Sequence, residues 1–370
     1  MRRRRSITGG LAALLALAIA LPAAAQDASP APLDLEAATV GPNGEASTAA
    51  GDLAPLTDDE IAQIRAGGHS AALLWAGAGT WYNALTAGAR DAAERLGIEI
   101  VTEAEANFDP ARQATDVETA LALRPDIILT LPVDPVSAAQ AFRPAVDAGA
   151  KLVFVDNGID GYAAGTEYVT VVTGDHFGMG KTAADLMAEA IGGSGEIGFI
   201  FHDADYYVTN NRDRYFKAAI EQRYPDITIA AEQGFAEEGR TQEIAAAMLA
   251  QNPDLDGIYV AWSSAAQGVV AALREAGKTD VKVVAYDLDA VNDLDMAQCG
   301  NMYAVALDWP YLEGQLMIEV AARSLLGQSV PPFITVPVQT ETRPTILQVW
   351  AENVHADPPQ EIVEALETEC

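Results

Sequence analysis

The 370-residue sequence contains few basic residues, only two cysteines and no apolar segment long enough to cross a bilayer. Lysine and arginine number 22 against 53 acidic residues, a net charge of -31, and such a surface repels phosphate backbones and anionic lipid heads. Nucleic acid is therefore excluded as a partner. The longest early apolar run, Leu11 to Leu21, is about half the length that a membrane span requires. No cysteine lies near its end, which argues against a lipid anchor.

The first 25 residues have the composition of a secretory signal peptide. Residues 2–5 are four arginines, the apolar run follows, and Ala23 to Ala25 offer small residues for cleavage. The paired arginines before Ser6 leave twin-arginine export open beside general secretion. Removal of residues 1–25 would leave 18 basic residues against 53 acidic ones.

Residues 26–56 follow without a single aromatic side chain and are rich in Ala, Pro, Gly and acidic residues. Such a segment buries too little apolar surface to offset its ordering entropy, so we predict a flexible leader. Thr57 and Glu60 then have the spacing of a capping box at the start of a helix. In an oxidising compartment Cys299 and Cys370 could form a disulfide, or they could remain two free thiols; the sequence leaves both open.

A strand-helix alternation occurs twice after residue 70. Short β-branched runs alternate with amphipathic segments, which predicts an α/β protein with two doubly wound parallel-sheet lobes. The expected strands of the first copy are 71–75, 98–102, 127–131 and 152–156, with helices 81–96, 110–123 and 135–148. Those of the second copy are 197–201, 227–231, 258–262 and 281–287, with helices 210–223, 238–251 and 264–276.

Beyond residue 287 the pattern departs from the repeat. Residues 291–297 and 311–326 are expected to be helical, and 302–307 and 335–338 to be strands. These extra elements would let the chain cross back to the first sheet, forming a multi-strand hinge that suits closure around a ligand. We therefore predict an N-terminal lobe from residues 57–173 plus 309–336, and a C-terminal lobe from residues 174–308 plus 337–370.

Two glycine motifs resemble nucleotide-binding sequences but fail in detail. Gly77 and Gly79 follow the first strand, yet a dinucleotide fingerprint needs a third glycine where Tyr82 stands. The sequence around Gly180 ends like a phosphate loop, but its first glycine, Gly174, is one position too early. Both are better explained as glycines at strand-to-helix turns.

Two other clusters could carry chemistry. His202, Asp203 and Asp205 are potential metal ligands, but a fourth ligand and a helical His spacing are missing, so a polar loop is favoured. Asp156 and Asp287 could be the carboxylate pair of a glycoside hydrolase. They would serve equally well as acceptors for hydroxyl groups.

The carboxylates and the tryptophans coincide with the predicted strand ends, where open α/β sheets bind ligands. Asp156 and Asp287 end the last strand of each copy, and four of the five tryptophans, Trp75, Trp81, Trp262 and Trp309, lie at or just beyond strand ends. Flat rings stack on the C–H faces of sugars, while carboxylates, amides and arginine bind the hydroxyl groups.

In this order and spacing, the motifs give the chain, from about Ser70 to about Arg343, a resemblance to the ribose-type (type I) periplasmic sugar-binding protein family, the solute receptors of ABC importers. The motifs are Trp81-Tyr82, Leu131-Pro132-Val133-Asp134, Val155-Asp156, Asn211-Arg212-Asp213-Arg214, Ala285-Tyr286-Asp287 and Asp308-Trp309-Pro310.

The resemblance implies stacking by Trp81, Tyr82 and Phe235, hydroxyl binding by Asp156, Arg212 and Asp287, and a position near the hinge for Asp308. Relatives typically carry arginine at Asn157 and glutamine at Asp308, and polar residues at Trp75, Leu131 and Trp262, so ribose itself is not expected. We expect no metal and no cofactor. The complete predicted ligand-binding set is Trp75, Trp81, Tyr82, Asp134, Asp156, Asn157, Arg212, Phe235, Trp262, Asp287 and Asp308.

The resemblance implies a monomeric periplasmic receptor that binds a sugar, a polyol or a related small hydroxylated compound and delivers it to a membrane permease, without catalysis. Its alternatives are an exported glycoside hydrolase and a sugar sensor for chemotaxis. The excess of Asp156, Asp287 and Asp308 over Arg212 suggests in addition that the ligand carries a positive charge.

Overall fold

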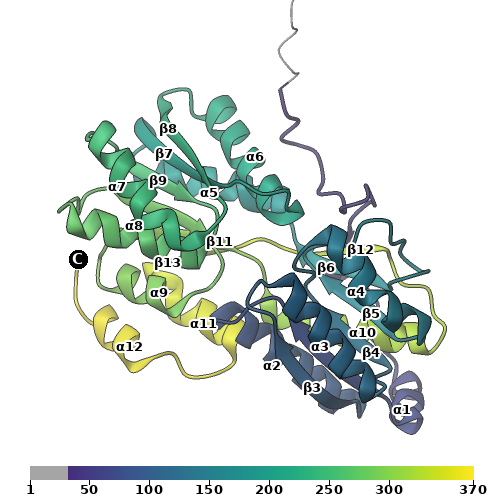
Figure 1. Cartoon of the computed structure of the whole chain (residues 1–370). Helices are drawn as coiled ribbons and strands as arrows, with labels where there is room; N and C mark the ends of the chain where they lie inside the picture. Colours follow the sequence, from purple (N-terminus) through teal and green to yellow (C-terminus); the bar gives the residue numbers. More distant parts are fainter. Residues whose placement is uncertain (1–31) are drawn as a thin grey trace, which may run out of the picture. The chain divides into compact units, whose positions relative to one another are not determined.

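The computed structural model describes residues 32–370, so the predicted signal peptide and residues 26–31 lie outside the described residues. The described chain contains two mostly parallel β-sheets, each covered by helices on both faces (Figure 1). This confirms the predicted α/β architecture with two doubly wound lobes. We call the lobe around the first sheet the N-terminal lobe and the lobe around the second sheet the C-terminal lobe.

The sheet of the N-terminal lobe has seven strands, and every neighbouring pair in it is parallel. Its central strands are almost wholly apolar and buried, as expected for a parallel sheet that is covered on both faces. The order across the sheet is β1 (Thr48–Ala49), β12 (Phe333–Val336), β6 (Thr170–Gly174), β5 (Lys151–Val155), β4 (Ile127–Thr130), β2 (Ser70–Trp75) and β3 (Glu99–Glu105).

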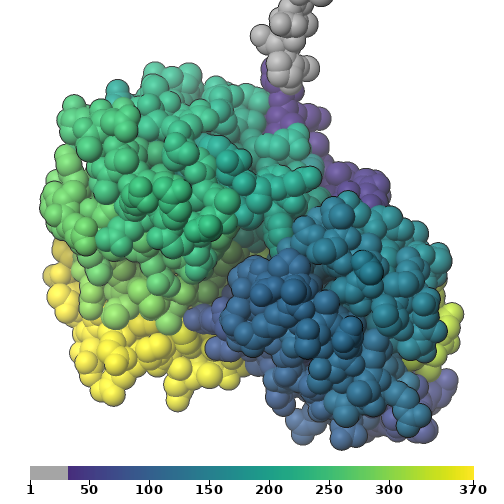
Figure 2. Space-filling model, viewed as in Figure 1, coloured from purple at the N-terminus to yellow at the C-terminus, as the bar shows by residue number. Residues whose placement is uncertain are grey.

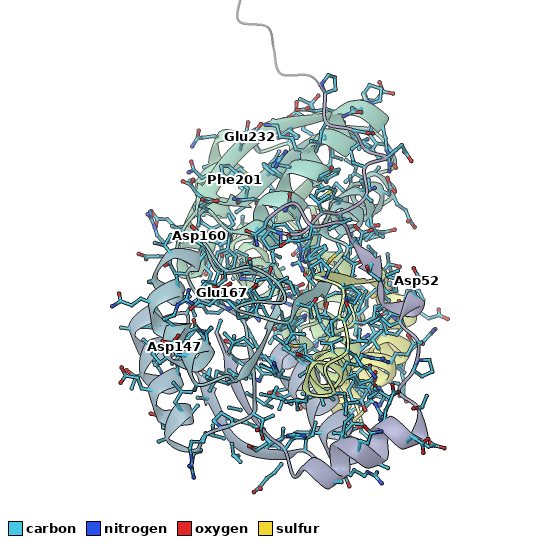
Figure 3. All side chains as sticks on the ribbon, turned by 90° about the vertical axis from the view of Figure 1, so that its right-hand side faces the viewer. Asp52, Asp147, Asp160, Glu167, Phe201 and Glu232 are labelled. Carbon is cyan, nitrogen blue, oxygen red and sulfur yellow. A yellow bond between two sulfur atoms is a disulfide. The ribbon has the colours of Figure 1, made fainter. Side chains whose placement is uncertain are left out.

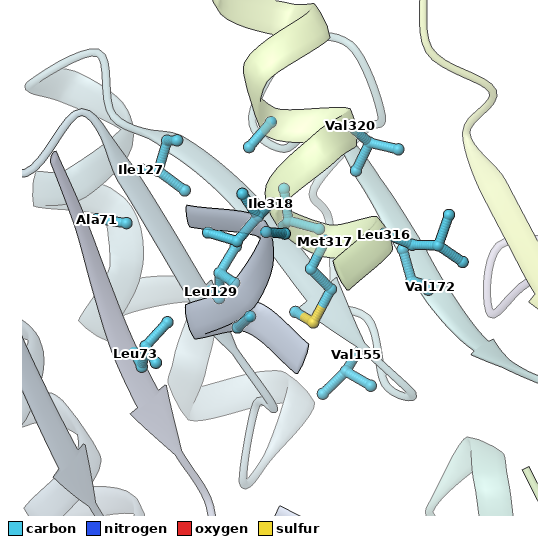
Figure 4. Packing of buried hydrophobic residues seen from close by; sticks show 14 of the residues in the cluster. Ala71, Leu73, Ile127, Leu129, Val155, Val172, Leu316, Met317, Ile318 and Val320 are labelled. Atoms are coloured by element: carbon cyan, nitrogen blue, oxygen red, sulfur yellow. The ribbon is translucent and has the colours of Figure 1, made fainter. Parts of the chain in front are cut away.

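Alternate side chains of these strands enter two separate cores. Leu73 enters the core on one face, where α10 with Met317 and Ile318 packs on β4, β5 and β6 (Figure 4), while Leu74 enters the core on the other face. Helices α1 (Asp58–Gly67), α2 (Thr80–Leu96) and α10 (Pro310–Leu325) cover the first face, and α3 (Pro110–Ala122) and α4 (Pro135–Asp147) the second.

The sheet of the C-terminal lobe has six strands, of which only β13 is antiparallel to its neighbour. The order is β13 (Gln339–Thr342), β11 (Met302–Leu307), β10 (Lys282–Tyr286), β9 (Gly257–Val260), β7 (Gly195–His202) and β8 (Ile227–Phe235). One face is covered by α5 (His176–Ala190) and α6 (Tyr207–Arg223), and the other by α7 (Thr241–Gln251), α8 (Ser263–Glu275), α9 (Ala290–Ala297), α11 (Ile346–Val354) and α12 (Gln360–Leu366).

The chain passes between the two sheets at three places: after β6, after β11 and after β12. The first two crossings lie close together, because a Cβ on Gly174 would stand 2.9 Å from the Cβ of Asp308. The lobe boundaries proposed from the sequence stay a prediction.

Several elements were absent from the sequence analysis. Strand β6 was missed because the repeat was ended at Asp156, and the strand expected at 335–338 is β12, which begins two residues earlier. Strand β13 and the C-terminal helices α11 and α12 were not anticipated either. By contrast, the predicted capping box is confirmed, since Thr57 and Glu60 each bond the backbone N–H of the other.

The leader is not flexible over residues 32–56, which corrects the prediction. Gln222 Nε2 donates to the carbonyl of Leu33 (3.0 Å) and Lys181 Nζ to that of Leu35 (2.8 Å), both from the C-terminal lobe. Further on, Thr48–Ala49 adds an edge strand to the N-terminal sheet. Figure 2 shows this segment, in purple, at the junction of the two lobes. The composition of the segment did not indicate this order, because the contacts that hold the segment are mainly hydrogen bonds of its backbone.

Gly180, part of the phosphate-loop-like motif, has a packing role. A Cβ at this position would stand 2.6 Å from the carbonyl oxygen of Arg212, so glycine permits the close approach of α5 and α6. This approach also fixes the backbone that carries the Arg212 side chain.

Acidic side chains are spread over the exterior of both lobes. Figure 3 labels Asp52, Asp147 and Asp160 from the N-terminal lobe and Glu232 from the C-terminal lobe, and all four are exposed. Over residues 32–370, no helix is both long enough and apolar enough to cross a membrane.

Cys299 and Cys370 form a disulfide, which decides between the two alternatives that the sequence left open. Their Cα atoms are 5.7 Å apart and 71 residues separate them in the sequence. The bond ties the end of the chain to the turn between α9 and β11.

We expect the double variant Cys299→Ser/Cys370→Ser to unfold at a lower temperature, because closing a long loop restricts the unfolded chain by about 2–4 kcal/mol. Thermal unfolding followed by circular dichroism measures the effect. A reducing agent should lower the melting temperature of the wild type and leave that of the double variant unchanged. Equal melting temperatures without reductant would contradict a stabilising role for the bond.

Candidate functional site

A cavity of about 640 Å³ lies between the lobes and is lined by residues of both. Its volume is within the range of sites for small molecules, roughly 300–1,000 Å³. The lobes also touch each other here: the Tyr206 hydroxyl donates to the carbonyl of Pro132 (3.2 Å), and the backbone N–H of Ala290 to Thr80 Oγ1 (3.4 Å). Ligand contacts could therefore come from both lobes at once.

One carboxylate enters the cavity from the end of β5 and another from the end of β10. Asp156 and Asp287 directly follow these strands, and both have a left-handed backbone, with φ of 64° and 67°. Their backbone N–H groups still bond the neighbouring strands, to Val172 and Ala306. Aspartate tolerates the left-handed region better than most residues, and such strained positions concentrate at functional sites.

The guanidinium of Arg212, on α6, lies beside Asp287 and Asp308 and is 3% exposed. Nη1 lies 2.9 Å from Asp287 Oδ1, and Nη2 lies 3.5 Å from Asp308 Oδ2. The group also lies over the ring of Tyr286, at 5.0 Å from its centroid. Burial would lower the pKa of Arg212, but the neighbouring carboxylates outweigh it and raise the pKa, so the charge is permanent.

A chain of hydrogen bonds leads from Arg212 across the hinge to Asp156. Arg212 Nε donates to His176 Nδ1 (3.2 Å), so the proton of the neutral imidazole lies on Nε2. Nε2 in turn is 2.5 Å from Thr173 Oγ1, whose hydroxyl donates to Asp156 Oδ1 (2.7 Å). Burial lowers the pKa of His176, which keeps the ring neutral. Thr173 and Asp156 belong to the N-terminal lobe, and His176 and Arg212 to the C-terminal lobe.

Asp156 and Asp287 differ in their electrostatic environments. Burial would raise the pKa of Asp156, but its hydrogen-bonding neighbours and the charge of Arg212 outweigh burial and lower it. For Asp287 burial dominates and raises the pKa, although Arg212 opposes the effect. Asp156 is therefore the more firmly charged of the two.

Behind the cavity lies a second pair of carboxyl groups, on Asp308 and Glu313, both with no exposed surface. Trp81 Nε1 donates to Asp308 Oδ1 (2.9 Å), whereas both oxygens of Glu313 lack a hydrogen-bond partner among the described residues. Burial and the nearby charge of Asp287 raise the pKa of Asp308 to about 7, and burial raises that of Glu313 well above its usual range. Burial therefore favours the neutral, protonated form of Glu313.

Carboxyl oxygens of Asp156, Asp308 and Glu313 lie within 4.8 Å of one another. Three oxygens fall short of the six to eight that calcium takes, and the guanidinium of Arg212 already supplies a cation beside Asp308. We assign no metal to this cluster. The polar loop of His202, considered above, is engaged otherwise, because His202 Nδ1 bonds Thr209 Oγ1 (2.8 Å).

Aromatic rings form much of the remaining wall. Trp81 and Tyr82, at the start of α2, meet edge to face with centroids 4.9 Å apart. Across the cavity, the Trp262 ring meets that of His202 at the same distance. The rings that line the cavity are those of Trp81, Tyr82, Phe108, His202, Tyr206 and Trp262.

Of the eleven residues predicted from the sequence, seven line the cavity: Trp81, Tyr82, Asp134, Asp156, Arg212, Trp262 and Asp287. Asp134 also has a structural role, because its carboxylate caps α4 by accepting from the backbone N–H of Ser137 (2.6 Å). Asp134 therefore both lines the cavity and stabilises the start of α4.

The other four lie outside the lining of the cavity: Trp75, Asn157, Phe235 and Asp308. Trp75 points into the core beside α2, because side chains alternate along β2, and its Nε1 donates to Thr86 (2.8 Å). Phe235 is 3% exposed and packs behind the ring of Trp262. Asn157 is 3% exposed, and Asp308 reaches the cavity residues only through Trp81 and Arg212.

The sequence analysis missed His176, Tyr206, Phe108 and Glu313. His176 follows the overlooked strand β6 by two residues, so recognition of that strand would have placed it at a sheet end. Tyr206 is also just past a strand end and could have been found in the same way. No sequence signal marks Glu313, which lies inside an ordinary amphipathic helix.

Comparison with known proteins places the chain among binding proteins. A family model described as a periplasmic binding protein domain matches residues 71–329. The ribose import binding protein of Bacillus subtilis is 23% identical over 263 residues, 71% of this chain and 83% of the relative. The xylitol-binding protein of Mycolicibacterium smegmatis is 24% identical over 249 residues, 66% of this chain and 69% of the relative.

Among solved structures, an ABC transporter solute binding protein from Agrobacterium vitis, bound with α-D-tagatopyranose, superposes with a TM-score of 0.68. It is 26% identical, and the match covers 75% of this chain and 96% of that protein.

The raised pKa of Glu313 predicts a pH-dependent gain in stability for Glu313→Gln. Above the usual pKa of 4.5, the wild type loses stability as pH rises, because the unfolded chain releases the Glu313 proton and the folded chain retains it. Glutamine removes this loss. Each unit by which the folded-state pKa exceeds the unfolded-state pKa corresponds to about 1.4 kcal/mol, so we expect the variant to be the more stable protein at pH 8.

Urea unfolding of both proteins at pH 4.5 and pH 8 measures the difference, which should be small at the lower pH. The charges that face Glu313 are those of Asp308, Asp156, Asp287 and Arg212, and both proteins share them. A difference that does not grow with pH would show that Glu313 ionises normally.

Proposed function

Because the chain belongs to the periplasmic binding protein family, we propose that it binds a sugar, polyol or related small hydroxylated compound between its lobes and delivers it to the permease of an ABC importer. It is a solute receptor and not an enzyme, as its relatives are binding proteins. The hydrolase alternative is set aside for the same reason. We also propose that it works in the periplasm as a monomer.

The observation that carries the proposal is the composition of the cavity. Carboxylates from both lobes, Asp156 and Asp287, stand beside the guanidinium of Arg212, and indole and phenol rings form the walls. Carboxylates accept hydrogen bonds from hydroxyl groups, while ring faces pack on C–H groups. The similar proteins named above are described as binding ribose, xylitol and tagatopyranose, all small and rich in hydroxyls.

Binding would favour closure of the lobes over an open form. Each lobe supplies only part of the contacts, so a ligand that touches both gains affinity only when they approach each other. The three chain crossings offer the hinge, and the hydrogen bonds from Arg212 through His176 and Thr173 to Asp156 cross it. A permease could then distinguish the closed, loaded form from the open one.

A thermal-shift screen of the mature protein against neutral sugars, polyols and amino derivatives tests the proposal. A ligand at 100 times its Kd stabilises the folded state by about 2.7 kcal/mol, which raises the melting temperature visibly. Each ligand that binds should be recovered chemically intact. Stabilisation only by compounds without hydroxyl groups would contradict the proposed substrate class.

Within that function we expect Asp287→Ala to weaken ligand binding by about 30- to 1000-fold, because it removes a buried acceptor and leaves Arg212 partly unpaired. Isothermal titration calorimetry measures the change. The matched control is Asp280→Ala, which removes an exposed carboxylate outside the cavity and should bind like the wild type. Unchanged affinity in a folded Asp287→Ala protein would remove Asp287 from the site.

A further inference from the structure

The cavity is strongly unbalanced in charge. Seven of its lining residues are acidic and one, Arg212, is a permanent cation: the acidic residues are Asp134, Asp156, Asp205, Glu237, Glu238, Asp287 and Asp289. The imidazole of His202 adds no charge, since burial lowers its pKa. A ligand made only of neutral hydroxyls would leave this imbalance uncompensated.

Some of these carboxylates are occupied by the protein itself. Asp134 and Asp289 cap the helices α4 and α9, and Glu238 accepts from Trp262 Nε1 (2.8 Å). Asp156 and Asp287 remain as the deep pair. Asp156 is 7% exposed, and the side chain of Asp287 is 17% exposed.

Many hydrogen-bond donors of the cavity already have acceptors within the protein. Trp81 Nε1 donates to Asp308, Tyr206 donates to a backbone carbonyl, and Trp262 Nε1 donates to Glu238. Arg212 uses Nε for His176 and Nη1 for Asp287. These donor groups therefore already have acceptors within the protein.

Acceptors, in contrast, remain available. Asp156 receives a hydrogen bond from Thr173 at Oδ1, and within residues 32–370 none reaches its Oδ2. The only side-chain partner of Asp287 over the same residues is Arg212. Behind them the fully buried Glu313, with both oxygens unpartnered, and Asp308 add further oxygen atoms near Asp156. One guanidinium serves this whole group.

Ring faces beside these carboxylates suit a cation as well. Trp81 and Tyr82 border the cavity next to Asp156 and Asp287, whose charges act on the Tyr82 hydroxyl. Aromatic faces attract ammonium groups, and the attraction grows when water is excluded. A protonated amine would thus be held by charge, by hydrogen bonds and by the rings.

We propose that the ligand is a small hydroxylated compound with a protonated amine, an amino sugar or amino polyol, whose ammonium group binds between the carboxylates of Asp156 and Asp287. The inference rests on the proposed receptor function and names its substrate class. An ammonium group brings three donors to a site rich in acceptors, and its hydrogen bonds to carboxylates are about twice as strong as neutral ones.

Matched pairs of probes that differ only by an amine in place of a hydroxyl provide the test. We would titrate the mature protein with D-glucamine and D-sorbitol, and with D-glucosamine and D-glucose, in a calorimeter at pH 7. In at least one pair the amine should bind at least about tenfold more tightly. Neutral members that bind as tightly as their amines, or more tightly, would overturn the inference while leaving the receptor function intact.

Variants locate the ammonium group. Asp156→Asn and Asp287→Asn keep the shape of the side chain and remove its charge, so each should reduce the preference for the amine more than the affinity for the neutral partner. The matched control Asp203→Asn removes an exposed carboxylate near the cavity but outside its lining, and should keep the preference. A preference that survives both cavity substitutions would overturn the placement.

Thermal unfolding of each variant verifies that it is folded, and the comparison of probes on the wild type does not depend on the variants. If no probe binds, whether aminated or neutral, the result counts against the proposed function as a sugar or polyol receptor. That outcome differs from the binding of neutral compounds alone, so failure of the inference and failure of the proposed function are distinguishable.

Discussion

The buried guanidinium of Arg212 is the interaction on which the site depends. It stands beside Asp287 and Asp308, packs on Tyr286 and begins the hydrogen-bonded chain that ends at Asp156. A buried charge is costly unless it is paired, and here one cation compensates several carboxyl groups. Burial, together with the surrounding carboxylates, raises the pKa of Asp308 and of Glu313. The negative charge of the cavity, and with it the proposed chemistry of the ligand, follows from that shortage of positive charge.

Under the proposed function, the same residues would connect ligand binding to movement of the lobes. Thr173 and His176 flank the first chain crossing, and Asp308 lies at the second. A ligand that alters the balance among Asp156, Asp287 and Arg212 therefore acts directly on the hinge. The leader adds a further link, because residues 32–56 bond to the C-terminal lobe and then join the sheet of the N-terminal lobe.

Local pattern was a reliable guide wherever neighbours in the sequence control the structure. Buried strands, amphipathic helices and the capping box of Thr57 are local properties, and the placement of Asp156 and Asp287 follows from their position at strand ends. Trp75 shows the limit: it also ends a strand, but the alternation along β2 turns it into the core. Which face a strand-end residue occupies depends on the register of the whole strand.

By itself, the sequence determined the two-lobed parallel α/β architecture and pointed to seven of the residues that line the cavity, because periodicity and strand-end position are local features. Only the tertiary structure decided the bond between Cys299 and Cys370, since they are 71 residues apart. It alone brought Glu313 beside Asp308 and Asp156, from a helix with no unusual pattern. Pairing across the chain depends on how helices and strands pack, which no short stretch of sequence specifies.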